Sequence, residues 1–554
     1  MLLTGAQIIM ECLLEQNVDT VFGYPGGAVL NIYDALYEYR NRIHHIRTAH
    51  EQGAAHAADG YARSTGKAGV CIATSGPGAT NLVTGIATAY MDSVPVVAIT
   101  GNVTVDLLGL DSFQEVDITG ITMPITKHNF LVKNIEDLAD TLRQAFQIAQ
   151  SGRPGPVLVD IPKDVTAKKY EYHKQEPLPF FPVPHPADAD LQHAVEMLKS
   201  SRKPFLYLGG GVTASGAARE AVAFAEKLDA PVSASLMAQG AFDAHNSRYM
   251  GMLGMHGTKT SAEAIKNCDL FVAVGTRFSD RVLCNAGLFA RNCPILQIDI
   301  DAAEFNKNID VDLRLEGDAR QVISILLPQL PQQSHPQWME QIHSWKKQYP
   351  LTQTAKAGVL PKDLLETLDR LTDSNAILTT EVGQHQMWTA QFYQFRRPRQ
   401  FLTSGGLGTM GYGLGAAIGA QAANPEKYVI NVAGDGGLHM NCNELSTLAN
   451  YHLPVVELLF NNSVLGMVRQ WQKLFYGSRF SQTTLDTNTD FCKLAEAFGV
   501  KAYRIRAKEE IEPVLQKALA LREPVLVDCW VDKDVNVLPM VPSGSSVEDP
   551  MLKM

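Results

Sequence analysis

The sequence predicts an α/β fold with three doubly wound parallel sheets, and two patterns lead to this prediction. Short apolar runs rich in β-branched residues recur along the chain, continuous rather than alternating, as in strands buried on both faces of a sheet. Helical stretches such as 136–150 and 189–199 separate them, and strands that alternate with helices form parallel sheets. The runs lie at residues 69–76, 94–101, 156–162, 204–211, 269–276, 294–301, 376–383, 428–436, 454–462 and 524–531.

The length of the chain indicates more than one domain. A single hydrophobic core stops growing at about 250–300 residues, and this chain has 554. Two proline-rich segments interrupt the alternation and are typical of surface linkers. We therefore expect domains at 1–167, 189–327 and 361–540, linkers at 168–188 and 328–360, and a short polar tail at 541–554.

The composition excludes several classes of protein. Hydrophobic residues make up 45% of the chain, charged residues 19%, and the formal net charge is −10, without the basic run that a nucleic-acid binder needs. The eight cysteines form no CxxC pair, which argues against zinc sites and a disulfide framework and fits a reducing cytosol. The N-terminus lacks the features of a signal peptide, and no apolar run is long enough to span a membrane. We expect a cytoplasmic protein.

Two polar turns predict a cation and phosphate site. Gly434, Asp435 and Gly436 follow one apolar strand, and Asn462 ends the next. A carboxylate and an amide oxygen at neighbouring strand ends can hold one Mg²⁺, while the glycines let a diphosphate approach the backbone. We expect a helix that begins near Asn443 to direct N–H groups at the anion. The alternative is a pair of strand-end turns in which Asp435 and Asn462 only cap.

A second glycine-rich string, Gly406 to Gly411, matches the dinucleotide fingerprint GxGxxG, but its context does not. Thr403, Ser404 and Gly405 precede it instead of a strand, and no acidic residue follows in the expected setting. The string is better interpreted as a loop that closely approaches a cofactor, with Met410 as a wedge. Simple core packing is the alternative role for Met410.

The segment HEQGAAH at 50–56 places Glu51 at the start of a helix rich in small residues. Its second histidine is too far along for the HExxH of a zinc protease. Another backbone could pack against Ala54, Ala55, Ala57 and Ala58, so Glu51 would be poorly solvated and its neutral form favoured. The string from GDG at 434–436 to NN at 461–462 resembles the thiamine-diphosphate motif, and such a carboxyl suits the aminopyrimidine of that cofactor, whose activated form supplies a nucleophile and an electron sink. A solvent-facing glutamate is the alternative.

Taken together, these motifs resemble the catalytic subunits of acetohydroxyacid (acetolactate) synthases. The similarity rests on RTAHEQGAAHAADGYAR around Glu51 and on the segments TSGPGATN, SFQE, SGRPGPVLVDIPKD, GMLGMHGT, GGLGTMGYGL, GDGG and NNSVLGMVRQWQKLFY. It extends from about residue 4 to residue 544. The resemblance implies three domains that bind the aminopyrimidine, FAD and the diphosphate, active sites built by two copies of the chain, and a separate small regulatory subunit.

The resemblance also assigns roles to individual residues. Mg²⁺ would be held by Asp435, Asn462 and the carbonyl of Val464. Thiamine diphosphate would contact Glu51, Val382, Gly383, Gln384, His385, Gly408, Met410, Gly434 and Gly436. A structural FAD would contact Arg153, Gly209, Gly210, Gly211, His256, Gly257, Arg277, Asp299 and Asp318. Substrate handling would fall to Gly27, Phe113, Gln114, Lys163, Met255, Arg281 and Trp471, with the Arg281 guanidinium meeting a keto-acid carboxylate.

One departure and several alternatives accompany these assignments. The family usually has RFDDR, and this chain has Ser279 at the first acidic position of that string. This substitution leaves the strength of FAD binding open. On their own, the glycines at 209–211 could form a plain strand-to-helix turn, and Asp299 and Asp318 could merely cap helices.

The resemblance implies a reaction in which pyruvate loses CO₂ and the resulting hydroxyethyl carbanion attacks a second 2-keto acid. Pyruvate as acceptor gives 2-acetolactate, and 2-ketobutyrate gives 2-aceto-2-hydroxybutyrate, at the first common step of valine, leucine and isoleucine biosynthesis. An FAD-free catabolic acetolactate synthase, a pyruvate oxidase and a non-catalytic regulatory protein on the same fold are the alternatives. Acceptor preference, feedback control and the choice between dimer and tetramer stay open.

Overall fold

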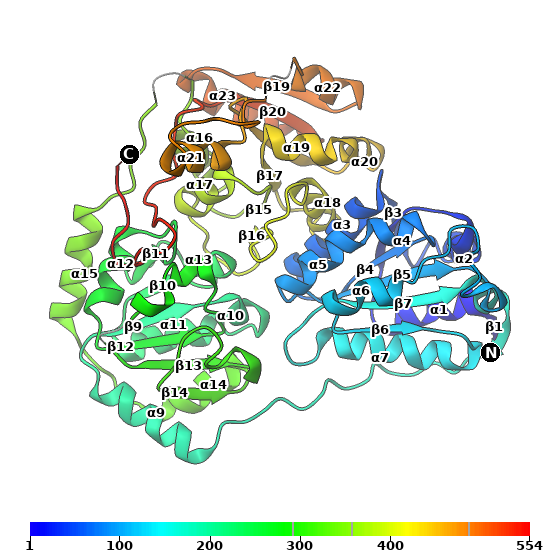
Figure 1. Cartoon of the computed structure of the whole chain (residues 1–554), viewed down its shortest axis with the longest axis horizontal. Coiled ribbons are helices and arrows are strands. Elements are labelled where there is room, and N and C mark those ends of the chain that lie inside the picture. The colour runs from blue at the N-terminus through cyan, green and yellow to red at the C-terminus, as the bar shows by residue number, and fades with distance from the viewer. Residues whose placement is uncertain (291–292, 356–357, 486–487, 554) are drawn as a thin grey trace.

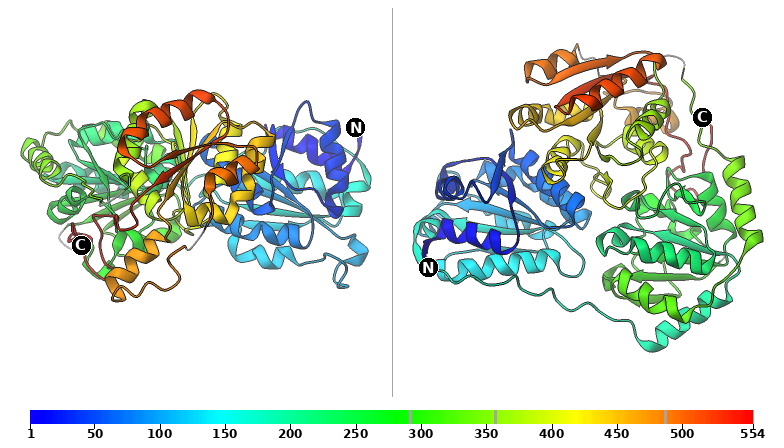
Figure 2. Two further views of the ribbon diagram at one scale, coloured as in Figure 1. Left: turned by 90° about the horizontal axis from the view of Figure 1, so that it is seen from above. Right: turned by 180° about the vertical axis from the view of Figure 1, so that it is seen from behind.

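The computed structural model describes residues 1–290, 293–355, 358–485 and 488–553. It contains three six-stranded sheets and one two-stranded sheet. Each six-stranded sheet, with the helices on its faces, forms one lobe of the molecule (Figure 1). The view from behind shows the same three lobes, with one long segment running from the N-terminal lobe to the central lobe (Figure 2).

The N-terminal lobe contains a sheet with the order β3-β2-β4-β5-β7-β6, in which all neighbouring strands are parallel. Its strands are β2 (Thr20–Gly23), β3 (His44–Arg47), β4 (Gly69–Ala73), β5 (Val96–Asn102), β6 (His128–Leu131) and β7 (Val157–Pro162). Its helices are α1 (Gly5–Glu15), α2 (Leu30–Glu38), α3 (Glu51–Thr65), α4 (Pro77–Asn81), α5 (Val83–Met91), α6 (Ile118–Thr122), α7 (Leu138–Gln150) and α8 (Lys163–Ala167).

The central lobe repeats this plan with the strand order β11-β10-β9-β12-β13-β14, again parallel throughout. The strands are β9 (Pro204–Leu208), β10 (Val232–Ala234), β11 (Tyr249–Met252), β12 (Leu270–Val274), β13 (Ile295–Asp299) and β14 (Leu313–Glu316). The helices are α9 (Asp188–Ser200), α10 (Gly210–Ala214), α11 (Ala218–Leu228), α12 (Lys259–Asn267), α13 (Asp280–Leu283), α14 (Ala319–Leu326) and α15 (Pro336–Gln348).

The C-terminal lobe has the strand order β16-β15-β17-β18-β20-β19, also parallel. The strands are β15 (Ile377–Thr380), β16 (Phe401–Leu402), β17 (Val429–Gly434), β18 (Val455–Asn461), β19 (Lys501–Ile505) and β20 (Val525–Trp530). The helices are α16 (Pro361–Leu371), α17 (Gln384–Phe392), α18 (Gly413–Ala423), α19 (Asp435–Asn441), α20 (Leu445–Asn450), α21 (Gly466–Phe475), α22 (Phe491–Ala497) and α23 (Lys508–Leu521).

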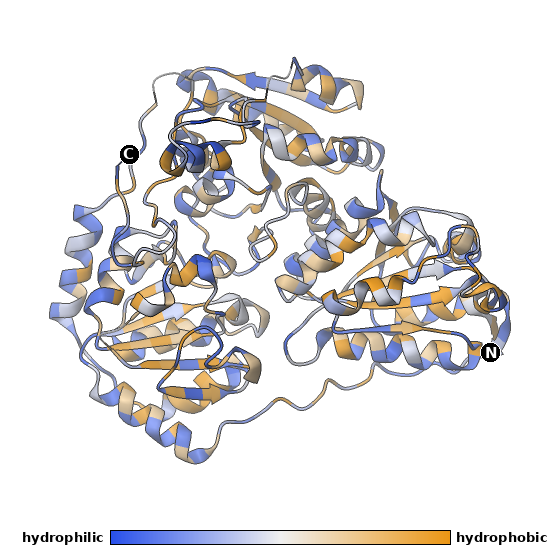
Figure 3. Ribbon diagram, in the orientation of Figure 1, coloured by the Kyte–Doolittle hydropathy of each residue, from blue (hydrophilic) through white to orange (hydrophobic). Residues whose placement is uncertain are grey.

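These sheets confirm the predicted fold class. Every strand-like run of the sequence contains a strand of the structure. The central strands of each sheet are strongly apolar, as the colouring by hydropathy shows (Figure 3). Parallel strands with helices on both sides are buried on both faces, so their side chains need not alternate between apolar and polar.

The two proline-rich segments contain more regular structure than the sequence predicts. Residues 328–360 include helix α15, whose Trp338 side chain is buried and donates its indole N–H to Pro204 O at 3.0 Å. Pro336 occupies the first turn of this helix, where a missing N–H costs nothing, so it starts the helix instead of breaking it. In the first segment, β8 (Lys169–Glu171) pairs antiparallel with β1 (Leu2–Thr4).

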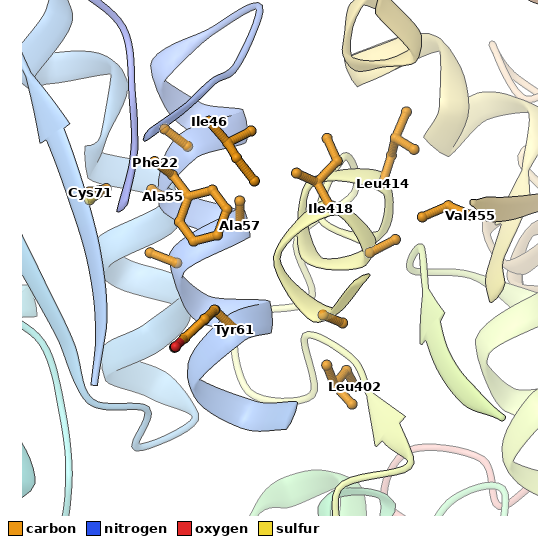
Figure 4. Close-up of a cluster of buried hydrophobic side chains, with 14 of the residues drawn as sticks. Phe22, Ile46, Ala55, Ala57, Tyr61, Cys71, Leu402, Leu414, Ile418 and Val455 are labelled. Carbon is orange, nitrogen blue, oxygen red and sulfur yellow. The ribbon is translucent and has the colours of Figure 1, made fainter. Parts of the chain in front are cut away.

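Helices α3 and α18 bring the N-terminal and C-terminal lobes into tight contact (Figure 4). The prediction that another backbone could pack on the alanines of α3 is confirmed. A Cβ built on Gly419 would lie 1.8 Å from Ala57 O, and one built on Gly60 would lie 2.1 Å from Ala416 O. Small residues on both helices therefore allow their backbones to touch, and a single apolar cluster continues from one lobe into the other.

Candidate functional site

The two polar turns of the C-terminal lobe meet at the carboxyl edge of its sheet. Asp435 Oδ2 accepts the backbone N–H of Ser463 at 2.6 Å, and Asp435 Oδ1 accepts that of Gly436 at 2.9 Å. Asn462 Oδ1 accepts the N–H of Val464 at 3.2 Å. Burial raises the pKa of Asp435 to about 7. The structure thus brings the carboxyl of Asp435 to the turn that carries Asn462 and Val464.

Helix α20 begins at Leu445, close to the position expected near Asn443, but a different helix, α19, begins at the turn that carries Asp435. Helix α19 starts at Asp435 itself, with Gly434 as its N-cap residue. The glycine-rich turn runs directly into the helix because it continues from strand β17 without a loop. The free N–H groups of the first turn of α19 consequently lie beside Asp435, where an anion would be favoured.

A buried histidine adds an unpaired polar atom to this edge. A Cβ on Gly434 would lie 2.9 Å from His385 Nδ1, and a Cβ on Gly383 would lie 2.8 Å from His385 Cε1. His385 Nε2 is buried without a hydrogen-bond partner among the described residues, and burial lowers the pKa of this imidazole to about 4. Gln384 Oε1 is likewise unpaired, although its Nε2 donates to Gln470 Oε1 at 2.9 Å. Buried atoms of this kind usually have partners, so the edge fits a polar ligand.

The loop between β16 and α18 carries Gly408 and Met410 over this edge. The Met410 Cε atom lies 3.6 Å from the position that a Cβ on Gly436 would occupy. Gly408 and Gly411 have φ angles of 72° and 89°, a region that favours glycine. The loop can therefore bring its backbone close to a ligand beside Gly436.

Carboxylates from two lobes hold this loop in place. On its C-terminal side, the buried Glu381 accepts N–H groups from Gly411 at 2.5 Å and Gly413 at 2.8 Å, and burial raises the pKa of Glu381 to about 7. On its N-terminal side, Asp92 of the N-terminal lobe accepts N–H groups from Gly405 at 3.0 Å and Gly406 at 2.7 Å. The loop is fixed at both ends.

A buried charge network supports Asp92. Arg63 donates to Asp92 Oδ2 at 2.9 Å, to Asp59 Oδ1 at 2.6 Å and to Thr403 O at 3.0 Å. Tyr412 donates its hydroxyl to Asp59 at 2.6 Å. Two carboxylates balance the positive charge of Arg63. The start of the loop bonds Arg63 and Asp92, and its end bonds Asp59 of helix α3 through Tyr412.

A cavity of about 900 Å³ lies between the three lobes, next to the loop. Its walls include Met255, Arg281 and Trp471, together with Val382, Gly383, Gly408 and Met410. Arg281 Nη1 lies 3.6 Å from Met255 Sδ, and the guanidinium carbon lies 5.9 Å from the centre of a Trp471 ring. Arg281 therefore places a solvent-accessible cation beside the Met255 and Trp471 side chains, which suits a small carboxylate with an apolar group.

The central-lobe candidates, except for Gly209 and Gly257, line the same cavity, together with Arg153 of the N-terminal lobe. Asp318 Oδ1 accepts the N–H of Gln321 at 3.0 Å and so caps helix α14, which is the alternative role expected for it. Arg153 forms ion pairs with Asp301 and Glu304. His256 Nδ1 and Gln239 Nε2 are buried without partners. Burial raises the pKa of Asp299 to about 6 and lowers that of His256 to about 4. The candidates that line the cavity are Arg153, Gly210, Gly211, His256, Arg277, Asp299 and Asp318.

Apart from Arg153, the N-terminal-lobe candidates form a separate group that does not line this cavity. Glu51 accepts a hydrogen bond from Asn81 Nδ2 at 2.9 Å and lies beside Gly78, whose Cβ would be 3.3 Å from Glu51 Oε1. Gln114 packs against Gly76, which lies in the same turn as Gly78. The φ angle of Gln114 is 60°, a strained value for a residue other than glycine. Gly27 and Phe113 are exposed and Lys163 is half-buried, all at the carboxyl edge of the N-terminal sheet.

Within one chain the candidates thus form two half-sites. The cavity half-site contains Arg153 and the candidates of the central and C-terminal lobes, some of which line the cavity while others, such as His385 and Asp435, lie at the adjoining sheet edge. The edge half-site contains Gly27, Glu51, Phe113, Gln114 and Lys163. Among the described residues, no cluster of three His, Cys, Asp or Glu side chains could hold a metal by itself. The pair Asp435 and Asn462 supplies only hard oxygen atoms, a donor set that fits Mg²⁺ when phosphate and water complete its coordination.

Comparison with known proteins decides the family. The chain matches three models of thiamine pyrophosphate enzymes: the N-terminal TPP binding domain over residues 3–121, the central domain over 191–326 and the C-terminal TPP binding domain over 381–529. A probable acetolactate synthase large subunit from Methanocaldococcus jannaschii is 47% identical over 98% of this chain and 94% of its own length.

Two bacterial relatives agree. The acetolactate synthase large subunit of Corynebacterium glutamicum is 47% identical over 99% of this chain and 90% of its own length. The large subunit of acetolactate synthase isozyme 2 from Escherichia coli is 44% identical over the full length of both chains. The chain belongs to the acetolactate synthase large-subunit family.

Membership in the acetolactate synthase family confirms the resemblance inferred from the motifs. The chain is a thiamine-pyrophosphate-dependent enzyme, with binding domains for this cofactor at both ends. In the part of the chain that the structure describes, no helix is long and apolar enough to cross a membrane.

Sequence reasoning missed several residues that shape the site. Asp92, Glu381 and Arg63 hold the Met410 loop, and Glu444 accepts the N–H groups of Ala49 and His50 just before Glu51. Glu381 could have been suspected as an acid at a strand end next to Val382. The partners of Asp92 and Glu444 lie hundreds of positions away in the sequence, so no local pattern reveals them.

Proposed function

We propose that the protein decarboxylates pyruvate and joins the remaining two-carbon unit to a second 2-keto acid. The products are 2-acetolactate from pyruvate and 2-aceto-2-hydroxybutyrate from 2-ketobutyrate, at the first common step of branched-chain amino acid biosynthesis. The observation that carries this proposal is one cavity with the Met410 loop over the Asp435 edge at one side and Arg281, Met255 and Trp471 at the other. Family membership supports the same reaction.

Several residues would hold the cofactor and its metal. Asp435, Asn462 and the carbonyl of Val464 would coordinate Mg²⁺, and the N–H groups at the start of α19 would contact the diphosphate. His385 and Gln384 carry unpaired buried atoms that polar ligand groups would satisfy. Bound thiamine diphosphate supplies the carbon nucleophile and the electron sink that decarboxylation and carbon–carbon bond formation require.

Arg281 would bind the carboxylate of the second keto acid. Its guanidinium is largely exposed to the cavity and its one acidic neighbour, Asp280, lies 3.7 Å away, so a bidentate ion pair with substrate is available. Trp471 and Met255 would contact the alkyl group of the acceptor, since both pack against the same guanidinium. Pocket walls of this kind distinguish a methyl from an ethyl group by about 1–3 kcal/mol.

The far end of the cavity would hold FAD in a structural role. The turn from β9 into α10 places Gly210 and Gly211 at the cavity wall, where a phosphate can approach a helix start closely. His256 Nδ1 and Gln239 Nε2 belong to residues of the same wall and have no hydrogen-bond partner among the residues that the structure describes. A polar ligand with several hydrogen-bonding groups would satisfy them.

Glu51 would act at the cavity of a second copy of the chain. The sheet edge that carries Glu51 exposes a group of large apolar side chains, and so does the C-terminal edge around the Met410 loop. Exposed apolar patches of this kind mark protein–protein interfaces. On the N-terminal edge these are Leu30, Leu107, Leu110, Phe113 and Met123, and on the C-terminal edge they are Leu407, Met440, Val468, Phe475 and Tyr476. Two-fold pairing would cover both edges and bring Gly27, Gln114 and Lys163 to the same reaction centre.

Mixing two inactive variants tests this shared site. Glu51→Ala and Asp435→Ala each remove activity, but a hybrid dimer contains one site with neither change. Because random reassembly gives half hybrids with one intact site each, the mixture should regain about a quarter of wild-type activity. Absence of any recovery, with hybrid formation shown by differently tagged chains, would contradict the shared site but not the reaction.

Glu51 itself would exchange a proton with the aminopyrimidine of the cofactor. Glu51→Ala should slow hydrogen exchange at the thiazolium C2 of bound thiamine diphosphate by about 10²–10⁴, the usual contribution of a positioned acid–base group. Nuclear magnetic resonance after acid quench measures this rate. Unchanged exchange would remove Glu51 from the mechanism.

Product analysis tests the reaction. Purified protein given pyruvate, Mg²⁺ and thiamine diphosphate should release CO₂ and form acetolactate without peroxide, and should carry bound flavin. Peroxide formation would indicate a pyruvate oxidase, and acetolactate without flavin would indicate the catabolic type. No CO₂ at all would indicate a non-catalytic relative.

Two further expectations rest on the relatives. Because the relatives are named large subunits, we propose that this chain associates with a small regulatory subunit. Co-purification of a tagged chain with its small partner, followed by inhibition of the complex by a branched-chain amino acid, checks this. The cytoplasmic location expected from the sequence stays a prediction.

A further inference from the structure

Two thiols outside the cavity lie in contact in the central lobe. Cys268 Sγ and Cys293 Sγ are 3.4 Å apart. Cys268 is buried at the end of α12, and Cys293 is half-buried two residues before β13. Among the described cysteines, no other pair of sulfur atoms makes a hydrogen-bond contact.

The register of the sheet explains why the two residues meet. Strands β12 and β13 are parallel neighbours, with Phe271 opposite Ile295. The chain enters both strands at the same edge, so Cys268 and Cys293 lie side by side at that edge. Neighbouring strands are about 4.8 Å apart, and a disulfide needs Cα atoms about 4.4–6.8 Å apart. Side-chain rotation would therefore be enough to bond the two sulfurs.

The two thiols differ in reactivity. A hydrogen bond from Cys268 lowers the pKa of Cys293, whereas that bond and burial raise the pKa of Cys268. Three acids near Cys293, namely Asp269, Asp312 and Glu548, act in the opposite direction. The more accessible thiol is thus also the one whose anion is better stabilised by its neighbour, which is the arrangement of an attacking and a resolving cysteine.

We propose that Cys268 and Cys293 form a reversible oxidation site that peroxide converts into an intramolecular disulfide. The Cys293 thiolate attacks one peroxide oxygen: an S–O bond forms, the O–O bond breaks, and hydroxide leaves and takes up the thiol proton as water. Cys268 then attacks the Cys293 sulfur: an S–S bond forms, the S–O bond breaks, and a second water leaves. Two thiols lose two electrons and two protons, and one peroxide becomes two waters.

The disulfide would close a ring around residues 269–292. That segment contains Arg277 and Arg281, both in the wall of the cavity. The pair also lies under the C-terminal tail, since Val547 packs in the same apolar cluster and Lys259 donates to Glu548 O at 3.0 Å. Oxidation would therefore tie together the two strand entries that flank the cavity-lining arginines.

The test uses the full-length protein, reduced and then exposed to hydrogen peroxide. Peptide mapping without reductant should yield a peptide that links Cys268 to Cys293, and dithiothreitol should restore both thiols. In Cys268→Ser, Cys293 should instead accumulate as a sulfenic acid that dimedone traps. Cys284→Ser, which removes a nearby half-buried thiol, should leave the linked peptide unchanged.

Two outcomes would overturn the proposal. One is sulfenic or higher oxidation of Cys293 in the wild type with no linked peptide. The other is a linked peptide that joins either residue to a different cysteine. Serine is close to cysteine in size, and circular dichroism of both variants shows whether they are folded. The readout requires no catalytic activity, so its outcome is independent of the proposed reaction.

Discussion

The C-terminal lobe makes two contacts with the rest of the chain, and they are built in opposite ways. Against the N-terminal lobe, α18 packs on α3 through Gly60, Ala57, Ala416 and Gly419, with no space for another methyl group. Against the central lobe, the C-terminal lobe leaves a cavity of about 900 Å³. Cationic side chains line this cavity, together with buried polar atoms that have no hydrogen-bond partner among the described residues. One contact fixes geometry and the other leaves room for ligands.

The difference shows where sequence change should be tolerated. In the closed contact a single added carbon meets backbone, which cannot move away cheaply. In the open contact an added group meets solvent or ligand, so it alters binding more than folding. Substitutions in the two contacts therefore separate an effect on folding from an effect on binding.

Gly419→Ala should break the closed contact. Alanine in place of glycine within a helix is usually favourable by about 1 kcal/mol, but here its Cβ would lie 1.8 Å from Ala57 O. We expect a net loss of about 2–3 kcal/mol in the free energy of unfolding, because overpacking outweighs propensity. Denaturant unfolding of the cofactor-free protein measures it.

Gly27→Ala provides the control. No heavy atom lies within 4 Å of the position of a Cβ on Gly27. Stability should change by less than about 0.5 kcal/mol, while activity falls because Gly27 is a candidate residue of the edge half-site. Equal destabilisation by both substitutions would show that the close approach of α3 and α18 does not matter.

Asp92→Asn should loosen the Met410 loop. The amide keeps one acceptor for Gly405 and Gly406 but removes a negative charge from beside Arg63. Hydrogen bonds to a charged group contribute about 1.5–3 kcal/mol, so we expect thiamine diphosphate to bind about 10- to 100-fold more weakly. Quenching of tryptophan fluorescence during cofactor titration gives the affinity.

Glu304→Gln is the matched control for Asp92→Asn. It removes an acid that pairs with Arg153 and Lys307 instead of with the Met410 loop. Its thiamine diphosphate affinity should equal that of the wild type. If Glu304→Gln lowered the affinity for thiamine diphosphate as much as Asp92→Asn does, the loss of affinity would reflect a general loss of protein stability.

His56 should make the closed contact sensitive to acid. Burial lowers the pKa of this side chain to about 3, whereas an unfolded histidine has a pKa near 6.5. Above pH 6.5 the neutral His56 costs the folded state nothing, and the free energy of unfolding has its full value. As the pH falls from 6.5 toward 3, that free energy decreases by up to about 1.4 kcal/mol per pH unit, because only the unfolded chain binds the proton. The difference in unfolding free energy between wild type and His56→Gln, measured from pH 7 to pH 5, isolates this group. A pH-independent difference would show that His56 is not the cause.

Ser279→Asp should have the smallest effect and should act in the open contact. Ser279 precedes α13 without capping it and lies in the cavity wall with Arg277 and Arg281. A carboxylate there would restore the acid usual in the family and form a partly exposed ion pair worth about 0–1 kcal/mol. FAD should then dissociate up to about fivefold more slowly, as flavin fluorescence on dilution would show. Slower release in Ser279→Ala as well would exclude the charge as the cause.

The sequence predicted the parts of the site that depend on local pattern. Asp435 and Asn462 end neighbouring parallel strands, so their proximity follows from strand order. The glycines that flank Met410 predict a loop of close approach, and in the structure this loop lies beside Gly436, while its contact with the cofactor stays a prediction. The structure added Asp92, whose partners Gly405 and Gly406 are more than three hundred positions away. It also added α15, because a proline-rich segment is typical of a linker although Pro336 occupies the first turn of a helix.

Helix α3 has a consequence for how two reaction centres influence each other. Glu51 begins this helix, while Asp59 and Arg63 near its other end hold the loop that carries Met410 of the same chain. A helix of 15 residues is about 22 Å long and, when packed this tightly, moves as one body. If Glu51 serves the neighbouring copy, cofactor bound in one cavity would shift the acid offered to the other. Cooperative thiamine diphosphate binding would be the visible sign.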